Sequence, residues 1–77
     1  MTLDIMKDEM VALAKHHVTE SRAIVERQRL RLQRLAAAGR SIEDAERALR
    51  LFENTLAIFE KRLHDLMKGA DGREAIG

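Results

Sequence analysis

The chain has 77 residues, with no cysteine, no proline and two phenylalanines but no tyrosine or tryptophan. Its 14 basic and 13 acidic side chains leave a formal net charge of +1, so the composition points to neither a polyanion-binding protein nor an acidic one. The lack of cysteine excludes disulfides and thiolate metal sites. One small domain of this length buries little apolar surface, and self-association is one way to stabilise it.

The hydropathy pattern gives no sign of a membrane protein. No apolar run approaches the about 20 residues that a membrane-spanning helix needs, and no basic segment precedes an apolar leader. We therefore expect a soluble cytoplasmic protein without a membrane partner. The scarcity of glycine and the lack of proline favour an all-α fold over a loop-rich one.

The first predicted helix covers about residues 3–38. It ends at Gly39, which follows three alanines, and glycine readily adopts the left-handed conformation that closes many helices. Residues 39–41 are the predicted turn.

The second predicted helix covers about residues 42–67. Ser41 is expected to cap it in a capping-box-like pair with Asp44, since side-chain oxygens accept from the free N–H groups of a first turn. Residues 1–68 thus form one helical hairpin, and residues 69–77, which lack an apolar pattern, are predicted to be a flexible tail.

Both helices carry the seven-residue apolar repeat that is typical of coiled coils. We call its two apolar positions the seam. In the second helix they are Ile42, Leu49, Leu56 and Leu63, and Ala45, Phe52, Phe59 and Leu66. In the first helix they are Val11, Val18, Val25 and Leu32, and Ala14, Ser21, Gln28 and Leu35. Folding at the turn predicts an antiparallel, coiled-coil-like hairpin.

The alignment of the two seams matches side-chain volumes and charges. Val25 falls opposite Leu56, and the small Ser21 falls beside the large Phe59, as a packed core requires. Residues 22–40 carry six arginines and one glutamate, whereas the next twenty residues carry five acids and two arginines. Two ion pairs are therefore expected across the seam, Arg22 with Glu60 and Arg29 with Glu53.

The segment HHVTESRAIVERQRLRLQRLAAAGRSIEDAERALRLFENTL resembles a group of short alpha-proteobacterial proteins of unknown function. The resemblance covers about half the chain and is carried by His17, Val18, Ile24, Gln28, Leu35, Gly39, Phe52, Glu53, Thr55 and Leu56. It implies a bacterial helical-hairpin protein and no activity. The sequence departs from the group at Arg40-Ser41 in the turn.

A second apolar stripe runs beside the seam. A two-helix hairpin leaves such a stripe in water, and a contiguous exposed apolar patch usually marks an interface. We predict that it is a self-association interface, through which two hairpins form a homodimeric four-helix bundle. The pattern leaves open how the hairpins are oriented and whether the assembly exceeds a dimer. The predicted interface residues are Met6, Met10, Leu13, Ile24, Leu51 and Ile58.

The predicted helices differ in length, which bears on where this stripe lies. Residues 3–38 would span about 54 Å and residues 42–67 about 39 Å at the helical rise per residue. About ten N-terminal residues are therefore expected to extend past the second helix, at the roughly 1.5 Å rise of each residue.

The histidines raise the question of a metal site. His17 falls opposite His64, with Glu20 and Glu60 about one turn away, which resembles half of a site that a second chain completes. The spacing differs from the Glu-x-x-His motif of di-iron bundles. We interpret these histidines as polar residues at an interface edge, and predict no metal and no cofactor.

The arginines of the first helix suggest a nucleic-acid partner. Arg27, Arg31 and Arg34 share one helix face, where they would meet phosphates. The balanced net charge, the few aromatics and an acidic second helix expected to neutralise the arginines in part weigh against this.

No catalytic constellation is visible in the sequence. It has no cysteine nucleophile, no Ser-His-acid set and no glycine-rich phosphate loop, so we predict a protein that is not an enzyme. The sequence favours a small protein–protein interaction or regulatory module with an unidentified protein partner. The alternative is a nucleic-acid-associated protein that uses the arginine-rich face.

Overall fold

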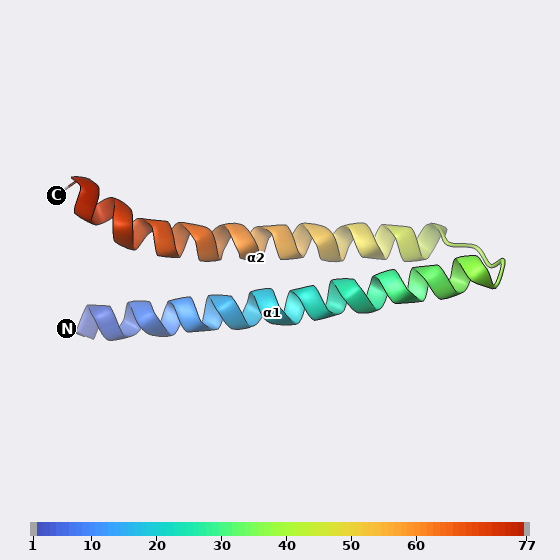
Figure 1. Ribbon diagram of the computed structural model, residues 1–77, viewed down its shortest axis with the longest axis horizontal. Helices are drawn as coiled ribbons and strands as arrows, with labels where there is room; N and C mark the ends of the chain where they lie inside the picture. Colours follow the sequence, from blue (N-terminus) through green and yellow to red (C-terminus); the bar gives the residue numbers. More distant parts are fainter. Residues whose placement is uncertain (1, 77) are drawn as a thin grey trace.

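The computed structural model describes the backbone of residues 2–76 and the side chains of residues 6–68. In that part the chain forms two helices, α1 (Thr2–Ala37) and α2 (Glu43–Ile76), and no strand. The helices run antiparallel and side by side, with the start of α1 and the end of α2 at one end of the molecule and the turn at the other (Figure 1). The prediction of an all-α two-helix hairpin is confirmed.

The two helices are almost equal in length, with 36 residues in α1 and 34 in α2. The predicted end of the second helix at Met67 and the predicted overhang of the first helix are therefore wrong. Gly69 and Gly72 both lie within α2. A glycine weakens a helix interior by about 1 kcal/mol, which is too little to end the helix. The flexibility predicted for residues 69–77 stays a prediction, since their side chains lie outside the described residues.

A hydrogen-bonded glycine cap ends α1. Gly39 has a φ of 69°, and its N–H donates to the Ala36 carbonyl at 3.0 Å. The Arg40 N–H donates to the Leu35 carbonyl at 2.9 Å. These two bonds make a Schellman motif, which satisfies carbonyls that the end of a helix leaves free. The predicted role of Gly39 is confirmed.

The start of α2 differs from the prediction. The Glu46 N–H donates to the Ile42 carbonyl at 2.8 Å, so Ile42 rather than Ser41 is the residue that flanks the helix. The carboxylate of Asp44 accepts a hydrogen bond from the Arg47 guanidinium at 2.6 Å, and the hydrogen bonds among the described residues include no capping-box bond between Asp44 and Ser41. The acids of the first turn still favour this end through the helix dipole.

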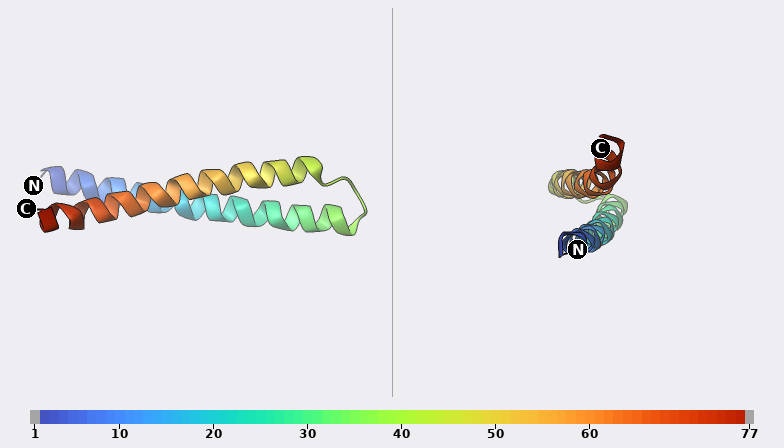
Figure 2. Two further views of the ribbon diagram at one scale, coloured as in Figure 1. Left: turned by 90° about the horizontal axis from the view of Figure 1, so that it is seen from above. Right: turned by 90° about the vertical axis from the view of Figure 1, so that its left-hand side faces the viewer.

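The core is a single row of side chains between the helices. The buried residues among those described are all at predicted seam positions: Ala14, Val18, Ser21, Val25 and Ala45. Seen end-on, the molecule is one layer of two helices, which cross at a shallow angle in the view from above (Figure 2). One layer cannot enclose large side chains, so Phe52, Leu56 and Phe59 remain only partly buried.

Candidate interaction surface

One edge of the seam is polar and held by ion pairs. Arg22 donates to Glu60 at 3.2 Å, and Arg29 donates to Glu53 at the same distance. Both predicted pairs are confirmed. Each is about half exposed, so each adds at most about 1 kcal/mol to stability. They show which residues of α1 and α2 lie level with each other.

The other edge of the seam is an apolar groove. A hollow of about 230 Å³ lies between the two helices, with the charged Glu20 at its margin. Its other lining residues are His17, Ser21 and Ile24 of α1 and Phe52, Thr55 and Phe59 of α2. Toward the chain ends, a second hollow of about 220 Å³ lies between Met10, Leu13, Ala14 and His17 of α1 and Arg62 and Leu66 of α2. Because His17 lines both hollows, they form one groove along this edge.

Packing inside the groove follows the predicted match of volumes. Ser21 is 7% exposed and lines the same hollow as Phe59. The Phe59 ring lies 5.0 Å from the ring of His17, with 38° between their planes. The small side chain of Ser21 leaves room for the phenylalanine, as the alignment of the two seams predicts.

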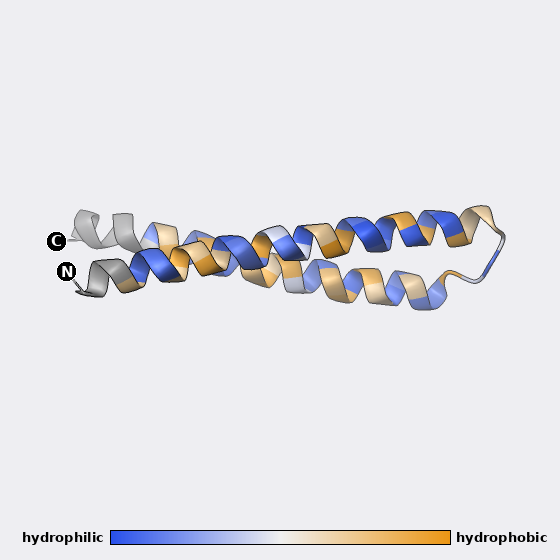
Figure 3. Cartoon of the chain, turned by 90° about the horizontal axis from the view of Figure 1, so that it is seen from below, coloured by the Kyte–Doolittle hydropathy of each residue, from blue (hydrophilic) through white to orange (hydrophobic). Residues whose placement is uncertain are grey.

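Of the six predicted interface residues, Met10, Leu13 and Ile24 line this groove. Ile24 is half-buried within the groove, and the other five are each more than half exposed: Met6, Met10, Leu13, Leu51 and Ile58. We call these six residues the apolar face. Figure 3 shows apolar segments recurring along both helices, interrupted by polar ones.

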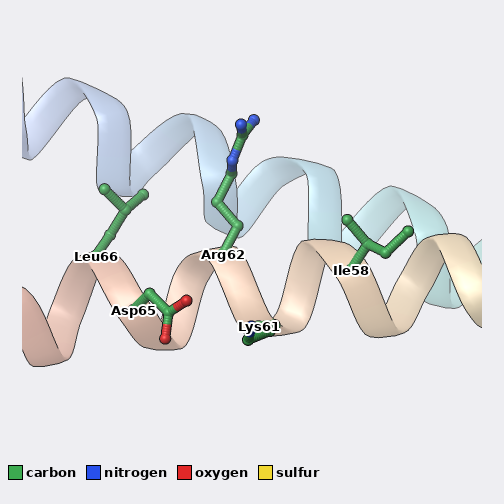
Figure 4. Close-up of a pocket in the computed structure, with 5 residues that line it drawn as sticks. All are labelled: Ile58, Lys61, Arg62, Asp65 and Leu66. Atoms are coloured by element: carbon green, nitrogen blue, oxygen red, sulfur yellow. The ribbon is translucent and has the colours of Figure 1, made fainter.

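Ile58 connects with the groove through its neighbours on α2. It lines a further hollow together with Arg62 and Leu66, which also line the groove. Figure 4 shows these three side chains projecting from α2 toward the side of α1, with Arg62 between the two apolar residues. Lys61 and Asp65 line the same hollow, so this part of the surface alternates apolar and charged side chains.

The arginines of α1 divide into two groups. Arg29 pairs with Glu53 and lies 3.7 Å from Glu26. Arg27, Arg31 and Arg34, which we call the arginine trio, form no ion pair with any side chain of residues 6–68. Glu53 and Glu60 of α2 reach α1 on the opposite edge, whereas Asp44 lines a hollow together with Arg31, so the partial neutralisation of this face stays a prediction.

The arginine trio continues the apolar face toward the turn. Arg31 holds the heptad position of Met10 and Ile24, while Arg27 and Arg34 hold that of Leu13. On α1 this face is thus apolar near the chain ends and basic near the turn, with His17 and Glu20 at the same heptad positions between the two parts.

The histidines separate into different environments. His16 lies 2.7 Å from Glu20, a pairing that the sequence analysis missed although its i,i+4 spacing signals it. His64 is exposed and lies 3.7 Å from Asp65. Among the described residues, no three histidine or carboxylate side chains gather closely enough to hold a metal ion. The lack of a metal or cofactor stays a prediction.

Neither helix, over its described residues, includes an apolar stretch long enough to traverse a bilayer. No family model, curated protein or solved structure matches the chain. The resemblance to short alpha-proteobacterial proteins therefore stays a prediction, as does the absence of enzymatic activity.

Proposed function

We propose that the protein is a small non-enzymatic interaction module that works as a homodimer, with two hairpins joined through their apolar faces. The observation that carries this proposal is the exposure of five large apolar side chains of the apolar face, two of which line the groove. A contiguous apolar patch of this kind usually marks an interface in a small protein. The resulting four-helix bundle would act as a scaffold or regulator for an unidentified protein partner.

The accessible surface of the hairpin supports this proposal. The chain exposes 6356 Å², whereas a compact monomer of its mass exposes about 4,800 Å². The surplus of about 1,500 Å² reflects the single-layer shape, and it exceeds the about 800 Å² that each partner buries in a standard interface. Dimerisation of a flat hairpin can therefore supply a stable interface.

The thin core gives a second argument. Val25 is the most buried core residue, at 2% exposed, and few large side chains are removed from water. Burying one exposed leucine, isoleucine or methionine stabilises by about 1.5–3 kcal/mol. Five such residues on each chain are enough to link folding to association.

The test is sedimentation of the full chain at micromolar concentration, together with a charged variant of the apolar face. The unmodified protein is expected to sediment as a dimer. Leu51→Glu with Ile58→Glu places like charges in the symmetric interface and is expected to give a monomer of lower helicity. Leu30→Glu with Met67→Glu is the matched control, because both residues are exposed but lie off the apolar face. A monomeric unmodified protein, or a control that dissociates equally, contradicts the proposal.

A second candidate function rests on the arginine trio. These three guanidinium groups are unpaired among residues 6–68 and would bind phosphates of a nucleic acid, with an affinity that falls steeply with salt. A mobility-shift titration with mixed DNA and RNA tests this. Replacing the trio by glutamine should abolish the shift, whereas the same replacement at Arg40, Arg47 and Arg50 should preserve it. No shift at low salt excludes this function.

A further inference from the structure

We infer that the two hairpins of the dimer pack in opposite directions, so that the turn of each lies beside the chain ends of the other. This inference rests on the proposed function, and it assigns the orientation of the partner on the apolar face. It follows from how apolar and charged side chains are distributed along the length of the hairpin.

The exposed apolar residues of the two helices are offset along the hairpin. The ion pairs place Arg22 opposite Glu60 and Arg29 opposite Glu53. By the same register, Ile58 lies level with Ile24, and Leu51 with Arg31. On α1, in contrast, Met6, Met10 and Leu13 lie in the third nearest the chain ends.

Reversing the second copy brings these two clusters together. With a two-fold axis across the hairpin near the level of Val18, the stretch from Met6 to Leu13 overlies the partner's stretch from Ile24 to Arg31. At that level the partner's α2 carries its Leu51 and Ile58. The apolar residues near the chain ends of each copy (Met6, Met10 and Leu13) therefore lie against those in the middle of the other copy (Ile24, Leu51 and Ile58). The same contact occurs twice, as an isologous interface requires.

The arginine trio argues against the alternative orientation. If both turns lay at the same end, six arginines would gather around one end of the interface, and like charges facing one another oppose association. In the reversed orientation the two trios lie about 40 Å apart at the helical rise, well beyond the Debye length of about 8 Å.

Charge at the chain ends favours the same orientation. Residues 2–14 carry three acids and one lysine, a net charge of −2. In the reversed dimer each arginine trio lies over this stretch of the partner. Glu9 is exposed there and forms no ion pair with any of the described side chains.

Distances between labels on the two copies test the orientation directly. The chain has no cysteine, so one introduced cysteine carries one label at a known position. Spin labels are placed on Ala38→Cys at the turn and, as a control, on Thr19→Cys near the proposed axis. Both residues are exposed, and each variant is first shown by sedimentation to remain a dimer. We expect a short intermolecular distance at residue 19 and a separation of about 60 Å at residue 38, from the helical rise.

Fluorescence transfer in mixed dimers gives the complementary positive signal. A donor on Ala38→Cys and an acceptor on Glu9→Cys are expected about 15 Å apart along the axis in the reversed dimer, but about 45 Å apart if both turns lie at one end. Weak transfer together with a short distance between Ala38→Cys labels would contradict the reversed orientation. The same result would still show that the protein is a dimer. Chains that sediment as monomers, with no intermolecular distance at residue 19, overturn the proposed function itself.

Discussion

Ser21 and Phe59 show how one small side chain shapes the core of a thin hairpin. Ser21 is buried, and the described residues contain no buried side-chain nitrogen or oxygen without a hydrogen-bond partner. Its small volume lets the phenylalanine ring approach α1 and stack beside His17.

Replacing Phe59 by alanine should lower the free energy of unfolding by about 2–3 kcal/mol. This is less than the about 3–5 kcal/mol that fully buried phenylalanines lose, because the ring is only partly covered in one hairpin. Chemical denaturation measures the loss. Leu30→Ala, an exposed position off the seam, should cost less than half as much, and equal losses would place Phe59 outside the core.

Replacing Gly39 by alanine should destabilise the hairpin by about 1 kcal/mol. The φ of 69° is unfavourable for any residue with a Cβ, by about 1–2 kcal/mol. No atom lies within 4 Å of a Cβ added there, so the cost is conformational rather than steric. Gly39→Asn should cost less in the same thermal melts, since asparagine tolerates this conformation. An alanine variant as stable as the natural chain would show that the cap is not needed.

At the scale of the helices, charge sets the register while apolar contact supplies the stability. Among residues 6–68, the ion pairs between acids of α2 and arginines of α1 lie along one edge. The other edge is left to the groove, so the two edges of the hairpin are chemically different. This asymmetry leaves the apolar face on one side of the hairpin.

The coupling between Arg22 and Glu60 should be small but measurable. A double-mutant cycle with Arg22→Ala and Glu60→Ala is expected to give about 0.2–1 kcal/mol at low salt, the range of exposed ion pairs. In about 1 M salt the coupling should approach zero, because the Debye length falls to about 3 Å. Arg27→Ala serves as control, since it lies off this edge and should show no coupling with Glu60→Ala.

At the scale of the whole molecule, stability should depend on protein concentration. A tenfold increase in protein concentration stabilises a linked dimer by about 1.4 kcal/mol per mole of dimer. The melting temperature is therefore expected to rise as the protein concentration rises. Circular dichroism melts across the micromolar range measure this rise. Leu51→Glu with Ile58→Glu should remove the dependence. A melting temperature that stays constant in the unmodified protein contradicts linked folding and association.

The spacing of residues along the chain is enough to predict the hairpin. The heptad repeat identified every buried residue of the seam, Gly39 marked the turn, and the alternation of charge gave the two ion pairs, because these features depend on local spacing along a helix. The stripe of apolar residues was likewise readable, since a helix presents every third or fourth residue on one side.

The partners of the polar side chains and the length of α2 follow from the folded arrangement and not from residue spacing. Asp44 pairs with Arg47 rather than with Ser41, and Glu20 pairs with His16 rather than with His17. Residue spacing allows either partner in each case, and the side-chain rotamer determines which pair forms. The arginine trio is unpaired among the described residues because α2 crosses α1 with its glutamates on the opposite edge. That placement depends on how two helices rotate against each other, which the repeat in either helix alone does not specify.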